Sequence, residues 1–117
     1  MNDYHNKLKQ LMDEYAHYIY KITKKFPKEE IYGITSQLRR SSLSIILNYI
    51  EGFARKRSAV KKNFWETSYG SLQESKYLVH FSLIENLITK KEYQKASKLS
   101  KEIGAMLWKA IEAIKIK

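Results

Sequence analysis

The sequence has no cysteine, one proline and four glycines among 117 residues. Without cysteine the chain has no thiolate nucleophile, no cysteine ligand for zinc and no disulfide bond, so its sulfur chemistry does not indicate a redox compartment. The length corresponds to about one domain, which is large enough to bury a hydrophobic core without disulfides. We therefore expect residues 1–117 to form a single domain.

Long hydrophobic runs are also absent. The longest run, at residues 43–50, is interrupted by Ser44 and Asn48 and is far shorter than the roughly 20 apolar residues that a membrane-spanning helix needs. The first ten residues, MNDYHNKLKQ, are polar and lack the apolar region of a secretion signal. These features predict a cytoplasmic protein without a membrane partner.

Acidic residues are outnumbered. The chain has 22 Lys and Arg residues against 12 Asp and Glu residues, a net charge of +10. Such a charge favours polyanionic partners, RNA or DNA among them, but it provides no recognition of sequence. Solubility alone can account for part of the charge, so nucleic-acid binding is one of two interpretations.

Hydrophobic residues recur at spacings of three and four along most of the chain, which is the period of an amphipathic α-helix. Four helices are predicted, beginning near Asn2 or Asp3, near Ile34 or Thr35, at Ser58 and at Thr89. Pro27 ends the first helix near Lys25, because the residue before a proline is pushed out of the helical region. Short loops force neighbouring helices to be antiparallel. The predicted fold is all-α, an antiparallel up-down-up-down four-helix bundle with a left-handed twist.

The ends of the third helix carry specific signals. Ser58 is its predicted N-cap, and Asn86 can end it in the left-handed conformation. Thr89 and Glu92 then have the spacing of a capping box that begins the fourth helix. Gly70, in the middle of the third helix, predicts close packing, because glycine there otherwise costs about 1 kcal/mol relative to alanine.

The predicted second helix has two ordered faces. The expected core face contains Leu38, Ser42, Ile45, Ile46, Tyr49, Ile50 and Phe53, and a polar stripe beside it contains Gln37, Arg40, Ser44, Asn48, Glu51 and Arg55. The polar stripe is either a solvated face with weak ion pairs or a contact between subunits made by Arg40, Asn48 and Glu51. One four-helix core cannot easily absorb both this face and the aromatic residues of the third helix, which favours a homo-oligomer with a different face on each side of the contact.

Five cations surround the turn between the second and third helices: Arg55, Lys56, Arg57, Lys61 and Lys62. The start of a helix offers free backbone amides, and arginine side chains fit phosphate oxygens. We predict a phosphate-binding site here, electrostatic and weakly selective for sequence.

No catalytic or metal-binding pattern accompanies these features. Glu14 and His17 have the Glu-x-x-His spacing of di-iron bundles, but such a site needs a second copy and two further glutamates. The three histidines, His5, His17 and His80, have no acid or serine at a recognisable spacing. We predict a protein that is not an enzyme and has no cofactor and no metal.

Most of the chain resembles a known family. The resemblance rests on PKEEIYGITSQLRR at residues 27–40, SLSI at 42–45, Asn48 and EGF at 51–53, with further similarity at 20–25, 70–72 and 106–108. These residues are similar to the four-helix-bundle proteins named for intervening sequences in bacterial 23S ribosomal RNA. The family usually has a proline where Ile46 stands and a small residue after Asn48, where this chain has Tyr49 and Ile50. We therefore expect a straighter second helix.

The resemblance implies a homopentameric ring of four-helix bundles. A similar bundle is the accessory protein of diversity-generating retroelements, which works beside a reverse transcriptase. Two functions follow from it: a basic scaffold that binds RNA or DNA, or a protein-interaction module whose partner is a protein such as a reverse transcriptase.

Overall fold

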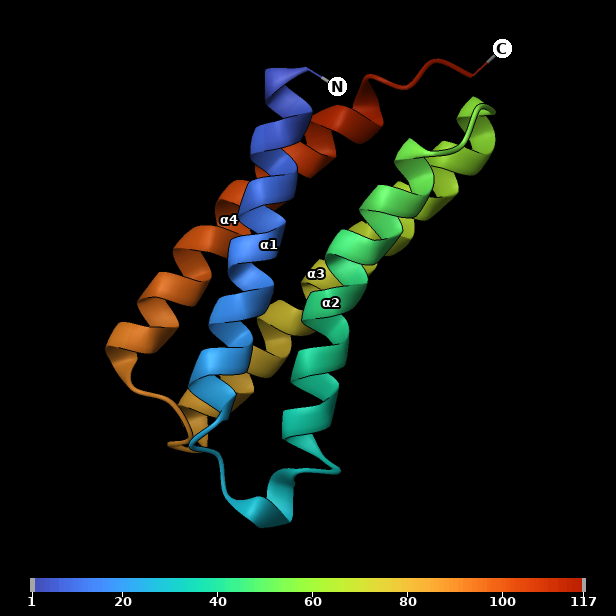
Figure 1. Cartoon of the computed structure of the whole chain (residues 1–117). Helices are drawn as coiled ribbons and strands as arrows, with labels where there is room; N and C mark the ends of the chain where they lie inside the picture. The colour runs from blue at the N-terminus through green and yellow to red at the C-terminus, as the bar shows by residue number, and fades with distance from the viewer. Residues whose placement is uncertain (1, 117) are drawn as a thin grey trace.

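The computed structural model describes residues 2–116 and consists of four long helices (Figure 1). They are α1 (Asp3–Thr23), α2 (Ile34–Phe53), α3 (Ser58–Ile84) and α4 (Lys90–Glu112), with the short 3-10 helix η1 (Lys28–Glu30) between α1 and α2. No strand occurs in this part of the chain. The prediction of an all-α four-helix bundle is confirmed.

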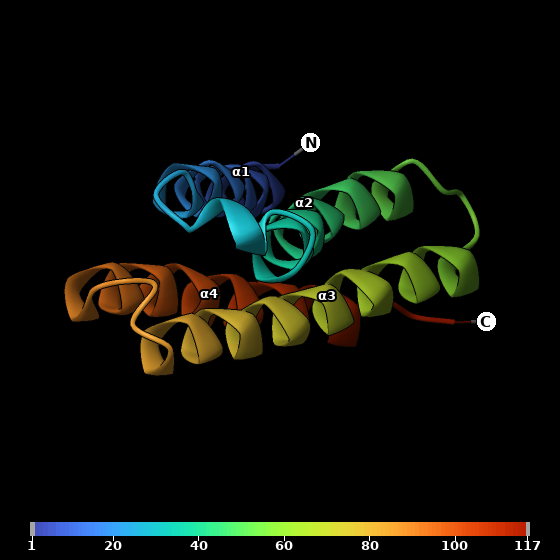
Figure 2. The same ribbon diagram turned by 90° about the horizontal axis from the view of Figure 1, so that it is seen from below.

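The helices form two layers, with α1 and α2 packed over α4 and α3 (Figure 2). Each helix packs along two others: α1 lies against α2 and α4, and α3 lies against α2 and α4, while Tyr15 of α1 also reaches Ser75 of α3 with a hydrogen bond of 2.7 Å across the core. The start of α1, the α2–α3 turn and the end of α4 lie at one end of the molecule, which we call the termini end (Figure 1). The α1–α2 and α3–α4 connections lie at the opposite end. An up-down-up-down order of the helices produces such an arrangement. That order and the left-handed twist of the bundle both stay predictions.

The core is built from apolar residues that recur at spacings of three and four on all four helices. Its largest fully buried side chains are Leu8, Met12, Tyr15, Ile19, Leu38, Ile45, Tyr49, Leu72, Ile103 and Leu107. The core face predicted for α2 is correct at Leu38, Ser42, Ile45 and Tyr49, while Ile46 and Phe53 are half-buried. Ile50 is 45% exposed, so its assignment to the core was wrong. Ile50 lies at the outer edge of α2, because consecutive residues of a helix point in different directions and Tyr49 points into the core.

Small residues bring α2 and α3 close together. The Ser68 hydroxyl donates to the carbonyl of Ile45 at 2.6 Å, and the Ser44 and Ser71 hydroxyls are 2.8 Å apart. Gly70 takes no part in this contact: nothing lies within 4 Å of the position that a Cβ atom would occupy there. The close packing predicted at Gly70 was wrong, because this residue faces away from both neighbouring helices.

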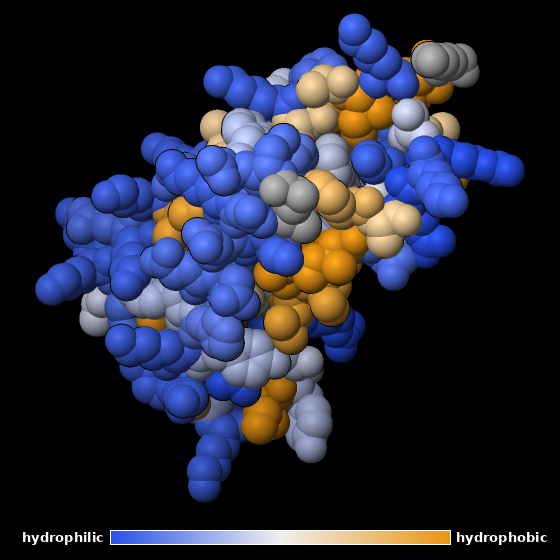
Figure 3. Space-filling model, turned by 45° about the horizontal axis from the view of Figure 1, so that its top comes forward, coloured by the Kyte–Doolittle hydropathy of each residue, from blue (hydrophilic) through white to orange (hydrophobic). Residues whose placement is uncertain are grey.

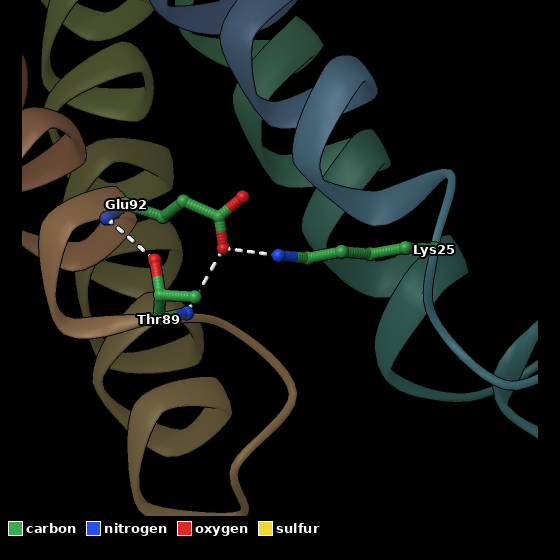
Figure 4. A network of polar contacts seen from close by, with 3 residues as sticks. All are labelled: Lys25, Thr89 and Glu92. Atoms are coloured by element: carbon green, nitrogen blue, oxygen red, sulfur yellow. Dashed lines mark hydrogen bonds and ion pairs between the residues drawn. The ribbon is translucent and has the colours of Figure 1, made fainter.

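The connection between α3 and α4 matches the sequence signals. Asn86 has a left-handed backbone with φ of 61°. The Thr89 hydroxyl accepts from the Glu92 amide at 3.1 Å, and the Glu92 carboxylate accepts from the Thr89 amide at 2.9 Å (Figure 4). The same carboxylate pairs with Lys25, which follows α1 (Figure 4). The capping box therefore also ties α4 to the end of α1.

The start of α3 differs by one residue from the prediction. Arg57, with an extended backbone, occupies the N-cap position, and Ser58 is the first helical residue. The Arg57 side chain makes no capping hydrogen bond. The predicted Ser58 cap is therefore wrong, and the first turn of α3 has no side-chain acceptor from its N-cap.

None of the helices described is long and apolar enough to cross a membrane.

Candidate nucleic-acid interface

The five predicted phosphate-binding residues lie together around the α2–α3 turn at the termini end. Arg55, Lys56 and Arg57 are exposed in the turn itself, which follows the last residue of α2. Lys61 and Lys62 follow in the first turns of α3 and are half-buried. We call these five side chains the turn cluster; Lys62 also lines a pocket that contains Glu66 and Glu112.

Two members of the turn cluster are held by neighbours. Arg55 forms an ion pair with Glu51, and its guanidinium lies 5.0 Å from the centre of the Phe64 ring. The Lys61 ammonium lies 5.5 Å from the ring of Phe53 and 5.6 Å from that of Trp65. A cation over an aromatic face keeps its charge and is oriented by the ring. These contacts fix two of the five charges in space.

The beginning of α3 adds a partial positive charge. The first amides of a helix have no partner within the helix, and they carry the positive end of its dipole. Because Arg57 provides no side-chain cap, the amides that follow it can donate to an anion. The predicted combination of helix start and cations is thus present, although its cap residue is Arg57 instead of Ser58.

A pocket of about 510 Å³ adjoins the turn cluster. Its lining comes from three helices and the C-terminal segment: Asn2, Tyr4, His5, Ser58, Lys61, Trp65, Lys109, Ala110, Ala113, Ile114 and Lys115. Sequence reasoning missed the contributions of Lys109 and Lys115. The predicted antiparallel order indicates that these two lysines lie near the turn cluster, because it brings the end of the fourth helix next to the start of the third.

His5 connects this pocket to an aromatic cluster in the core. Its Nδ1 atom is hydrogen-bonded to the Tyr49 hydroxyl, and its ring lies 5.1 Å from Phe53 and 5.6 Å from Trp65. Burial and, to a smaller extent, the Lys61 charge lower the pKa of His5. Burial raises the pKa of Tyr49, so the phenol stays protonated. Near neutral pH the charge at the pocket therefore comes from its lysines.

The three residues predicted at a subunit contact differ in exposure. Arg40 and Glu51 are exposed, and Asn48 is half-buried. Glu51 pairs with Arg55, another member of the polar stripe. The Asn48 amide donates to the carbonyl and hydroxyl of Ser44, both at 2.9 Å, which directs it towards α3. A role of Arg40, Asn48 and Glu51 between subunits stays a prediction.

Two apolar stripes remain on the outside of the bundle. The outer α2 stripe consists of Leu43, Leu47 and Ile50, and the outer α3 stripe consists of Tyr77, Phe81 and Ile84. Leu47 is 59% exposed, and Tyr77 and Ile84 are 63% and 61% exposed. Figure 3 shows a hydrophobic patch over α2 between hydrophilic surfaces. Each stripe places its residues four and three apart, on one face of its helix.

The three histidines have different neighbours in the described part of the chain. Glu14 and His17 are exposed on the outside of α1, as expected, and His17 pairs with Asp13 at 3.4 Å. His80 is exposed near the Tyr77 ring. Within residues 2–116, no group of three or more His, Cys, Asp or Glu side chains could hold a metal ion.

A family model and a solved structure are similar to this chain. Residues 5–109 match the family model described as 23S rRNA-intervening sequence protein. The fold is similar to the crystal structure of a protein with unknown function from the S23 ribosomal protein family of Bacteroides thetaiotaomicron, with a TM-score of 0.87 and 23% identity over 94% of this chain and 99% of that chain. No curated protein matches the sequence.

Proposed function

The chain belongs to the family of 23S rRNA-intervening sequence proteins, and we propose that it is a non-enzymatic, cytoplasmic scaffold that binds RNA or DNA through phosphate groups. The observation that supports this proposal is the turn cluster, in which five cations surround the start of α3. Lysine and arginine side chains and helix-terminal amides are common ligands of phosphate in nucleic acids.

The interface favours backbone contacts over base reading. Its cations come from a turn and from the beginning of a helix, and the exposed polar residues that follow on α3 include Glu66 and Glu74, whose carboxylates repel a phosphate backbone. Phosphate contacts position a nucleic acid without reading its sequence. We therefore expect similar affinities for RNA and DNA strands of equal length and unrelated sequence.

A salt titration tests this function. Fluorescence anisotropy with labelled single strands of RNA and DNA should show affinity falling linearly on a log-log plot, with a slope of about 0.7 for each phosphate neutralised on a single strand. A preference for one sequence that is insensitive to salt would contradict the proposal. Absence of binding at low salt would favour the protein-interaction alternative, with a partner such as a reverse transcriptase.

The scaffold is proposed to be a homo-oligomer, and the resemblance implies a pentamer. The two outer stripes support this proposal, because each leaves large apolar side chains exposed on a different helix. The charges near the two stripes differ in balance: Glu74, Glu85 and Lys76 flank the outer α3 stripe, whereas Lys21, Lys24 and Asp13 line a groove between α1 and α2 beside Leu43. When two unlike faces are in contact, a rotation relates each subunit to the next. The subunits form a closed ring if repeating this rotation returns to the first subunit.

A ring would repeat the turn cluster once in each subunit. Several weak phosphate contacts along one polyanion then combine through a high effective concentration. The oligomer and the nucleic-acid interface therefore support each other, although either can exist alone.

A further inference from the structure

We propose that the pocket at the termini end binds a terminal phosphate group, the phosphomonoester at one end of a nucleic-acid strand. This inference rests on the proposed nucleic-acid function and adds a site that recognises an end. It starts from the pocket volume of about 510 Å³, which lies within the range of roughly 300–1,000 Å³ found for ligand pockets.

The charge of the lining selects a strongly anionic group. Lys61, Lys109 and Lys115 come from α3, α4 and the segment after α4, and no acidic residue accompanies them among the described lining residues. A phosphodiester carries one negative charge, whereas a phosphomonoester carries about 1.5 to 2 near pH 7. Three lysines on the described lining therefore favour a terminal phosphate over an internal one.

The remaining lining suits the nucleoside attached to that phosphate. Ala110, Ala113 and Ile114 form an apolar wall, and Tyr4, which is 38% exposed, contributes aromatic surface, whereas Trp65 is almost fully buried. The Tyr4 hydroxyl donates to the carbonyl of Met106 at 2.7 Å, which holds the ring in place. Bases stack on aromatic side chains without regard to sequence. The site thus combines a charged part with an apolar part, as a terminal nucleotide does.

The pocket and the turn cluster form one continuous surface. Lys61 belongs to both, and Ser58, the first residue of α3, lines the pocket beside the turn. A strand whose terminal phosphate occupies the pocket can therefore place its following phosphates over Arg57 and Lys56. Binding of the end and binding of the backbone then reinforce each other.

The test compares strands that differ only at their ends. A 12-nucleotide RNA of one sequence is prepared with a 5′-phosphate, with a 3′-phosphate, with hydroxyls at both ends and as a closed circle, and each is titrated at one salt concentration. At least one phosphorylated strand should bind about tenfold more tightly than the hydroxyl and circular forms, the effect expected of one additional charge-assisted contact.

Variants locate the effect in the pocket. The double variant Lys109→Ala, Lys115→Ala should remove the preference for the phosphorylated end and leave the affinity for the circle unchanged. The matched control Lys98→Ala, Lys101→Ala removes two exposed α4 lysines outside this pocket and should retain the preference. A preference that persists in the Lys109, Lys115 variant would overturn the proposal.

Other outcomes separate this inference from the general function. Equal affinities for all four RNA forms would overturn the end-binding site while leaving backbone binding intact. No binding of any form would overturn both. The last experiment measures the affinity for adenosine 5′-monophosphate through tryptophan fluorescence. An affinity equal to that of the phosphorylated strand would assign the pocket to a free nucleotide and overturn the claim for strand ends.

Discussion

Gly52 of α2 lies so close to Trp65 of α3 that a Cβ atom at residue 52 would come within 2.5 Å of the indole Cδ1 atom. Trp65 is 3% exposed, and its Nε1 atom donates to the carbonyl of Tyr49 at 3.0 Å. The indole is therefore fixed on one side by α2 and cannot withdraw without breaking this hydrogen bond. This contact sets the spacing of the two helices next to the turn cluster.

Substitution of Gly52 tests this spacing. Gly52→Ala should destabilise the fold by about 1–3 kcal/mol, the usual cost of inserting an atom into a packed interface. Denaturant unfolding followed by far-ultraviolet circular dichroism measures the change. An unchanged unfolding midpoint would show that α2 and α3 are farther apart than the structure indicates.

Gly70→Ala provides a matched control with the opposite sign. Gly70 is exposed in the middle of α3, and nothing lies within 4 Å of its potential Cβ atom. Alanine should stabilise the protein by up to about 1 kcal/mol, because it lowers the conformational entropy cost of the helix. The same substitution should thus have opposite effects at the two glycines.

The capping box makes a second prediction about stability. Thr89→Ala removes the acceptor of the Glu92 amide and should cost about 1 kcal/mol. Ser58→Ala should have a much smaller effect, because Ser58 follows the N-cap of α3 and is not the cap itself. Equal losses in the two variants, measured by thermal unfolding, would contradict the assigned helix starts.

Stability should fall as the pH falls from about 7.5 to 5, because the folded state lowers the pKa of His5. The unfolded chain takes up a proton near the ordinary pKa of about 6.5, whereas the folded chain does so only at lower pH. This contribution to stability is therefore complete above the unfolded pKa and is lost as the pH falls towards the folded pKa.

The variant His5→Gln measures that contribution. It should flatten the dependence of the unfolding midpoint on pH in this range, while His17→Gln, at an exposed position of α1, should retain the wild-type dependence. If both variants follow the wild type, His5 is not the group responsible.

The self-association proposal predicts a mass several times that of the 13.9 kDa chain at micromolar concentration. Leu47→Glu and Phe81→Glu should each disrupt assembly, because each places a charge in one outer stripe. Tyr32→Glu, at a residue that is 95% exposed near η1, is the control. Light scattering that finds only monomers of the wild type would contradict the proposal.

A mixture of the two disruptive variants tests whether the contact joins unlike faces. Each variant retains the stripe that the other lacks, so an equimolar mixture should form dimers although neither variant assembles alone. If the contact instead joined two identical stripes, mixing would restore nothing.

Much of the fold could be predicted from local patterns. The capping box at Thr89, the left-handed Asn86 and the end of α1 before Pro27 depend on residues a few positions apart, and the structure has all three. The absence of the usual proline at residue 46 predicts a straighter second helix; α2 is continuous from Ile34 to Phe53, and its straightness stays a prediction.

Predictions failed where the answer depended on a neighbouring helix. Glycine has no side chain to indicate its surroundings, so the sequence could not show that Gly52, and not Gly70, lies at a close contact. Ile50 was assigned to the core from spacing alone, but the width of the buried face is decided by how α1 and α3 pack against α2. The basic turn was recognisable because its residues are contiguous, whereas Lys109 and Lys115 join it only through the tertiary fold.

The most direct measurement of the central claim compares two triple variants of equal net charge. One replaces Arg55, Arg57 and Lys62 of the turn cluster with alanine, and the other replaces Lys28, Lys90 and Lys91, which lie in η1 and at the start of α4. Affinity for one single-stranded RNA is measured across a salt series, and circular dichroism confirms that both variants are folded.

The turn variant should bind more weakly, with a log-log salt slope reduced by about 0.7 for each phosphate that the protein no longer neutralises, while the control remains close to the wild type. Identical affinities and slopes for the two variants would show that nucleic acid does not bind at the α2–α3 turn.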